Sequence, residues 1–126
     1  EEIANAIADR DKARIIPTGI KALNQLGLSN QIPMNIVFLT DGAARSIVVG
    51  KRTIKFKRTT PKNLAVKGKI TSLVIQALKE IGKENVTEGQ IDIILEHLKL
   101  EKEETIEYDA KLSPAWISKI IKNIKE

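Results

Sequence analysis

The stretch RSIVVGKRTIKFKR, residues 45–58, contains two segments of strand length separated by Gly50 and Lys51. A glycine at such a break is typical of a tight β-hairpin. In the second segment Ile54 and Phe56 point to one face, and the lysines between and after them point to the other, because side chains alternate along a strand. The sequence therefore predicts a hairpin with an apolar face and a strongly basic face.

Charge is distributed unevenly along the chain. The 126 residues carry a formal net charge of +5, yet residues 42–79 hold ten basic residues and no acidic one. The flanking segments, 1–41 and 80–126, carry net charges of −1 and −4. A basic segment of this kind favours a polyanion or an acidic protein surface as partner. The alternative is that the acidic C-terminal helices fold back and neutralise the basic strand.

Helical patterns lie on both sides of the hairpin. Apolar residues recur at helical spacing in residues 1–11 and 70–81, whereas MNIVFLT (34–40) is a continuous apolar run of strand length. The sequence TEGQ (87–90) resembles a capping box, and SPAW (113–116) is typical of a helix start. We predict an α+β fold in which a small antiparallel or mixed sheet with a basic hairpin is packed by N-terminal and C-terminal helices.

Length and composition favour one domain over residues 1–126, with the sheet at about 13–60 and a helical part at about 63–125. The chain has no cysteine, which excludes disulfides and thiolate chemistry. No apolar run approaches the roughly 18 to 20 residues of a membrane span. We expect a cytoplasmic protein without a membrane partner. Because the sequence begins without Met and already in helical pattern, we expect a further segment before Glu1.

No pattern in the sequence is typical of catalysis. His97 is the only histidine, so no zinc site is expected and His97 is interpreted as a solvated surface residue. The glycines form neither a dinucleotide-binding motif nor a P-loop. The acidic residues of segment 101–109 are interpreted as a solvated face. We therefore expect no catalytic residue, no metal and no cofactor.

The most serious enzymatic alternative is a metal-dependent nuclease. Asp41, at the end of a predicted strand, could supply one carboxylate for Mg²⁺. The second carboxylate would fall in the segment IKFK, which offers Lys55 and Lys57 instead. Asp41 is therefore interpreted as a turn residue before Gly42.

The basic hairpin is the strongest candidate for a functional surface. Its only aromatic residue, Phe56, is expected to face the core, which disfavours base stacking. Contact with phosphates or with an acidic protein surface remains. The predicted binding residues are Arg45, Lys51, Arg52, Lys55, Lys57, Arg58 and Lys62.

Four parts of the sequence resemble the C-terminal domain of AbiEi-like antitoxins, which belong to bacterial abortive-infection toxin–antitoxin systems. They are TGIKALNQLGLSNQIP (18–33), the strand ending in LTDG (39–42), the pattern R-x-I-x-x-G-x-R-x-I-x-F (45–56) and DAKLSPAWI (109–117). The resemblance implies a non-enzymatic antitoxin or transcriptional-regulator domain used in phage defence. It also implies a nucleotidyltransferase-like toxin as partner, and DNA binding mainly through an N-terminal winged helix that is missing from this sequence.

Two other interpretations stay open. The domain could be a degenerate or cryptic metal-dependent nuclease. It could also be a structural module that dimerises through the last helix, which carries an apolar stripe of Trp116, Ile117, Ile120, Ile121 and Ile124. We expect Trp116 to be largely buried against the core or against a second subunit.

Overall fold

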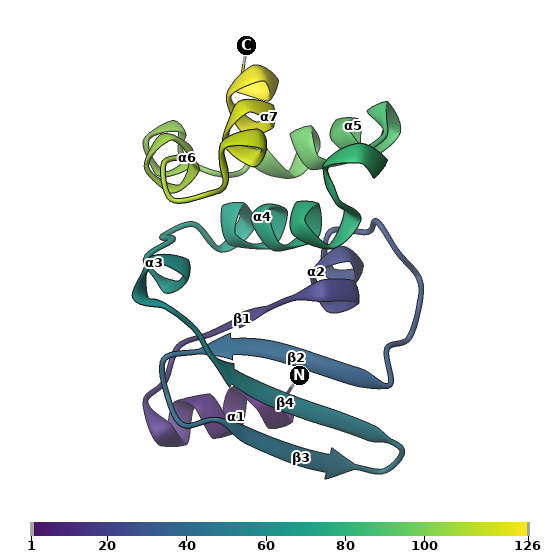
Figure 1. Cartoon of the computed structure of the whole chain (residues 1–126), viewed down its shortest axis with the longest axis vertical. Helices are drawn as coiled ribbons and strands as arrows, with labels where there is room; N and C mark the ends of the chain where they lie inside the picture. Colours follow the sequence, from purple (N-terminus) through teal and green to yellow (C-terminus); the bar gives the residue numbers. More distant parts are fainter. Residues whose placement is uncertain (1, 126) are drawn as a thin grey trace.

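The computed structural model describes residues 2–125, with the side chains of Lys62 and of residues 123–125 outside the description. The elements in chain order are α1 (Glu2–Asp11), β1 (Ile15–Pro17), α2 (Gly19–Gln25), β2 (Asn35–Thr40), β3 (Arg45–Val49), β4 (Arg52–Arg58), α3 (Pro61–Leu64), α4 (Lys69–Ile81), the 3₁₀ turn η1 (Lys83–Asn85), α5 (Glu88–Leu98), α6 (Glu103–Ala110) and α7 (Ala115–Lys125). The α+β prediction is confirmed, and the helices α4–α7 lie at one end of the molecule with the sheet and α1 at the other (Figure 1). Within the described residues no helix has the length and apolar character needed to cross a membrane.

The sheet is mixed. Its strands lie in the order β1-β2-β4-β3, so that β4 is inserted between β2 and β3. β2 and β4 run parallel, and the two outer pairs are antiparallel. The predicted hairpin is confirmed, because Val49 lies opposite Arg52 across a two-residue turn. Gly50 has φ +63°, which suits the first turn position of a type II′ turn.

One apolar cluster lies between the sheet and α1. It consists of alternate residues of the central strands and one residue of the helix: Ile36, Phe38, Ile54, Phe56 and Ala4. The rings of Phe38 and Phe56 have centroids 5.9 Å apart and planes inclined by 57°, a favourable geometry for two aromatic side chains. The helix α1 therefore covers the face of the sheet to which Ile54 and Phe56 point.

A second, larger apolar cluster surrounds α4. Every residue from Thr71 to Leu78 is buried, which is typical of a helix with neighbours on all sides. On one side α2 packs against it, and α5, α6 and α7 cover the other side (Figure 1). Although α2 precedes the sheet strands β2–β4 in sequence, it contributes Ala22 and Leu26 to this helical cluster.

The last helix packs through Ile117 and Ile121, which are fully buried. Trp116 and Ile120 lie beside them and are only partly buried, and the side chain of Ile124 lies outside the described part. The centre of the apolar face is thus formed by Ile117 and Ile121, two of the five residues of the predicted stripe, and Trp116 lies at its margin. Because this face packs within the chain, the interpretation of α7 as a dimerisation surface is weakened.

Two acidic side chains hold the N-terminus of α4. The carboxylate of Asp109 is fully buried and accepts the backbone N–H groups of Lys67 and Gly68, each at 2.7 Å. Glu101 Oε1 accepts two further backbone N–H groups of the first turn and the hydroxyl of Thr71, each at 3.1 Å. These carboxylates satisfy N–H groups that have no partner inside the helix, and they oppose the positive end of its dipole. The prediction of a solvated acidic face is therefore wrong for both residues.

The two ends of α5 provide one confirmed prediction and one error. Thr87 and Gln90 form the predicted capping box, with hydrogen bonds of 3.2 and 3.0 Å between side chains and backbone N–H groups. His97 is not a solvated surface residue. It is half-buried, and its Nε2–H donates to the carbonyl of Leu26 at 2.7 Å, which ties α5 to the C-terminal end of α2.

Candidate functional site

The face of the hairpin opposite α1 is open. Lys55 and Lys57 are exposed on it, as are Ser46 and Val48 of the neighbouring strand β3. Along β4 these lysines alternate with buried apolar residues, which confirms the predicted two-faced strand. The open face is thus a flat surface of β3 and β4 that no helix covers.

The neighbours of the two lysines on this face carry no charge. Lys55 lies opposite Val37 of β2 and Ser46 of β3, and Lys57 lies opposite Leu39 of β2. Among the side chains that the structure describes, no acidic group forms an ion pair with either lysine. The ammonium groups are therefore available to an external anion.

An open hollow lies where β3 begins and β4 ends, and its lining includes residues from both faces of these strands. It is lined by Val37, Ala44, Arg45, Ser46, Lys55, Phe56, Lys57 and Arg58. The structure thus brings four of the seven predicted binding residues to one hollow, and none of the described residues lining it is acidic. An open basic depression suits an extended anionic partner better than an enclosed small molecule.

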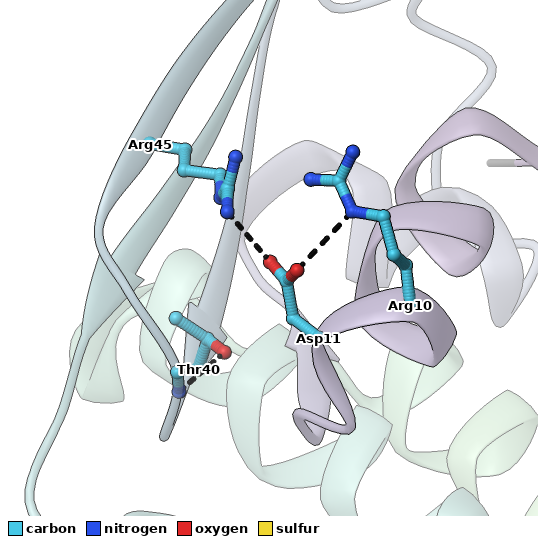
Figure 2. Close-up of polar contacts among 5 residues, drawn as sticks. Arg10, Asp11, Thr40 and Arg45 are labelled. Carbon is cyan, nitrogen blue, oxygen red and sulfur yellow. Dashed lines mark hydrogen bonds and ion pairs between the residues drawn. The ribbon is translucent and has the colours of Figure 1, made fainter.

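Arg45 has a partner within the chain, which separates it from the lysines. Its guanidinium lies 3.0 Å from Asp11 Oδ2, while Nε of Arg10 lies 3.2 Å from Asp11 Oδ1 (Figure 2). Across the ladder Arg45 lies opposite Phe56, so it belongs to the face that α1 covers. Its main role is to fix the C-terminal end of α1 to the beginning of β3.

The remaining predicted residues extend along and beyond β4. Lys51 is exposed in the hairpin turn, and Arg52 and Arg58 are exposed at the two ends of the strand. A strand of this length spans roughly 20 Å. Lys62 falls in α3, but its side chain lies outside the described part of the structure. The basic residues therefore form a band along β4 in which Lys55 and Lys57 point to the open face. Arg52 and Arg58 share the alternation of Ile54 and Phe56 and point to the side of α1.

The acidic helices do not neutralise this band. α5, α6 and α7 pack on α4, at the end of the molecule opposite the hairpin (Figure 1). Asp109 of α6 and Glu101 of the segment between α5 and α6 are directed at the N-terminus of α4. The alternative in which these helices fold back on the basic strand is not the arrangement of the described chain.

Asp41 takes part in the backbone structure of its turn. Its Oδ1 accepts the backbone N–H of Arg14 at 2.9 Å, which joins the segment before β1 to the end of β2. Next to it, Thr40 Oγ1 accepts the N–H of Gly42 at 3.0 Å (Figure 2). The interpretation of Asp41 as a turn residue therefore agrees with its contacts. In the part of the chain that the structure describes, no three His, Cys, Asp or Glu side chains gather as a metal site.

Comparison with known proteins places the chain in a family. Residues 1–106 match the model of a family of unknown function, DUF6088. The chain belongs to the DUF6088 family. No curated protein and no solved structure matches it. The part of this DUF6088 chain that matches includes the whole sheet and the basic hairpin, and α7 lies beyond it.

A second hollow of this DUF6088 chain was not anticipated from the sequence. A cavity of about 320 Å³ lies where α1, β1, α2 and α4 meet, and the residues that line it include three basic ones, Arg14, Lys67 and Lys69. The guanidinium of Arg14 donates to the carbonyls of Leu64 and Val66, and Lys67 Nζ lies 4.2 Å from the centre of the Tyr108 ring. Two of its three cations thus already have partners in the fold. The residues that line the cavity come from segments far apart in sequence, so no local sequence pattern predicts it.

Proposed function

We propose that this domain binds the phosphate backbone of DNA through the open face of β3 and β4, without catalysis. The observation that carries the proposal is the pair Lys55 and Lys57, exposed on an uncovered sheet face with only uncharged neighbours. Cationic side chains placed along a strand contact successive phosphates and release counterions. Lys51, which is exposed in the hairpin turn beside this face, extends the contact.

The chemistry of the face favours contact without reading of sequence. Lysine carries a point charge on a flexible stem and has none of the planar, bidentate geometry with which arginine recognises guanine. The only aromatic residue of β4, Phe56, is 5% exposed and faces α1, so it offers no stacking surface for a base. For the isolated domain we expect a Kd on the order of 10⁻⁴ to 10⁻⁶ M at physiological salt.

The resemblance to AbiEi-like antitoxins extends the proposal to a biological role. In that role the domain is the non-enzymatic part of a cytoplasmic bacterial regulator, and it supports autoregulation together with an N-terminal winged helix. Neutralisation of a nucleotidyltransferase-like toxin is the second candidate function. The same basic face favours it, because an acidic patch on a toxin would meet uncompensated ammonium groups there.

The test is a titration of random duplex DNA at roughly 50 and 200 mM salt. The variant Lys55→Glu/Lys57→Glu should weaken binding by at least about tenfold and remove most of the salt dependence. A matched variant, Lys111→Glu/Lys119→Glu, changes the net charge equally at exposed positions of the helical end. It should bind nearly as wild type does. Equal losses in the two variants would show that only the overall charge matters, and would overturn the assignment to the open face.

The same two variants separate DNA binding from toxin docking. If wild type does not bind DNA, and toxin neutralisation in cells is lost only with Lys55→Glu/Lys57→Glu, the face serves the protein partner. If the hairpin variant matches wild type in both assays, the basic strand is a solvated face and the proposal fails.

A further inference from the structure

The strand β3 is an edge of the sheet, and its unpaired backbone groups can be identified. The N–H of Thr53 in β4 donates to the carbonyl of Met34, at 2.9 Å, which directs Thr53 toward β2. The N–H of Thr59 likewise donates to the carbonyl of Thr40 and points toward β2. The N–H and C=O groups of successive residues point to opposite sides of a strand, so the backbone groups of Thr53 and Lys55 both point toward β2 and away from β3. Their β3 neighbours, Val48 and Ser46, therefore direct their own N–H and C=O groups out of the sheet.

This edge lacks the features that usually protect edge strands. Its pairing with β4 runs without a bulge from Arg45 to Val49, and it contains no proline and a single charged residue. Val48 is 72% exposed and Val49 is 36% exposed. Natural sheets normally protect such an edge with charges, prolines, bulges or a covering segment. An open apolar edge with free backbone groups is a site for the addition of another strand.

We propose that β3 pairs in antiparallel fashion with β3 of a second copy of this chain, centred on Ile47. The two four-stranded sheets then become one continuous sheet of eight strands. In this register the outward-facing groups of Ser46 meet those of Val48 of the second copy, and the two-fold axis repeats the pair. Four backbone hydrogen bonds form in this way, and each satisfies a group that β4 leaves free.

The side chains of β3 suit a copy of themselves. Arg45 lies opposite Val49 of the second copy rather than opposite another arginine, and Ile47 lies opposite Ile47. The basic turn at Lys51 lies next to Ala43 of the second copy, a small uncharged residue. No like charges are therefore opposed across the new pair, as a two-fold symmetric contact requires.

The two basic faces do not prevent this pairing. The Lys55 side chains of the two copies are separated by three strand spacings, roughly 14 Å. This exceeds the Debye length of about 8 Å at physiological salt, so their repulsion is largely screened. The contact involves one short strand from each copy, so the dimer is weak and forms only as concentration rises. It does not depend on the proposed DNA binding and is tested without DNA.

The experiment is sedimentation equilibrium over a wide concentration range, with Val48→Pro as the disrupting variant. Proline removes the N–H that points out of the sheet and leaves the bonds to β4 in place, which is the arrangement in which edge strands tolerate proline. Wild type should dimerise reversibly, and the variant should associate at least about tenfold more weakly. Val48→Thr keeps the N–H and should dimerise as wild type does. A dimer that survives Val48→Pro lies elsewhere, for example at α7, and overturns the proposal.

Hydrogen exchange of the wild-type protein decides the matter even if Val48→Pro fails to fold. The amides of Ser46 and Val48 should exchange fast at low concentration and slow down as concentration rises. The amides of Ile47 and Val49 bond to β4 and should be protected throughout. Protection that is independent of concentration at Ser46 and Val48, or a monomer at all concentrations, contradicts the pairing.

Discussion

Charged side chains have different roles at the two ends of this molecule. At the helical end, Asp109 and Glu101 look like members of a solvated acidic run, yet they accept backbone N–H groups of α4. At the sheet end, Lys55 and Lys57 remain exposed beside uncharged neighbours. Charge that the fold uses internally contributes to stability, and charge that it leaves free is available for binding. Substitutions at the two ends should therefore affect different measurements.

The largest expected effect is on stability, at Asp109. The variant Asp109→Ala removes the acceptor of the part-buried N–H of Lys67 and of the buried N–H of Gly68. Each unsatisfied group costs about 1 to 3 kcal/mol, so the free energy of unfolding should fall by about 2 to 6 kcal/mol. Urea denaturation followed by the fluorescence of Trp116 measures it. Glu104→Ala, at an exposed position of the same helix, is the control and should lose well under half as much. Equal losses would show that Asp109 acts only through its charge.

The next effect concerns the space beside the Glu101 carboxylate. A Cβ added at Gly68 would lie 2.8 Å from Cγ2 of Thr105 and closer still to the Glu101 carboxylate. Gly68→Ala should therefore displace Glu101 from the first turn of α4 and lower the free energy of unfolding by about 1 to 3 kcal/mol. Gly89→Ala, in α5 with only Thr87 Oγ1 at 4.0 Å, is the matched control and should be neutral or slightly stabilising. Thermal melts that rank the two variants the other way would contradict the role of Glu101.

A smaller effect is expected at Arg45, a residue of the sheet end whose charge is paired within the fold. Its ion pair with Asp11 is partly exposed, so Arg45→Ala should lower the free energy of unfolding by no more than about 1 kcal/mol. It should also reduce DNA affinity less than Lys57→Ala does, because Asp11 already compensates its charge. Parallel denaturation and DNA titration of the two variants provide the measurement. A greater loss of affinity in Arg45→Ala would place Arg45 at the centre of the binding surface.

No effect at all is expected in a nuclease assay. Asp41 accepts the backbone N–H of Arg14, and β4 offers lysines where a second metal-binding carboxylate would be needed. Supercoiled plasmid and single-stranded RNA incubated with the domain and Mg²⁺ or Mn²⁺ should remain intact. Metal-dependent cleavage that disappears in Asp41→Ala would falsify the binding function and favour the nuclease.

The features that could be predicted are those with a local signature. The hairpin follows from alternation around Gly50, the start of α5 follows from Thr87 and Gln90, and the exposure of Lys55 and Lys57 follows from the period of a strand. These depend on neighbours within a few residues, so the sequence contains all the information required.

The features that could not be predicted join distant segments. Asp109 meets the N–H of Gly68 across 41 residues, and Asp11 meets Arg45 only because α1 lies under the sheet. The parallel pairing of β2 with β4 depends on β3 turning to the outside, which no local pattern specifies. A run of acidic residues has the same sequence pattern whether its side chains face water or a helix terminus. Only the tertiary packing distinguishes a solvated carboxylate from one that caps a helix.

The presence of two separate apolar clusters has a thermodynamic consequence. Arg14 joins the parts that contain them, because its backbone N–H donates to Asp41 near the sheet and its guanidinium donates to the carbonyls of Leu64 and Val66 on the way to α4. Parts with their own cores are candidates for separate cooperative units. A ligand on the hairpin stabilises the unit that it touches by mass action. A saturating polyanion should therefore move the calorimetric transition of the sheet part to higher temperature. The strength of the coupling through Arg14 determines how far the transition temperature of the helical part rises with it.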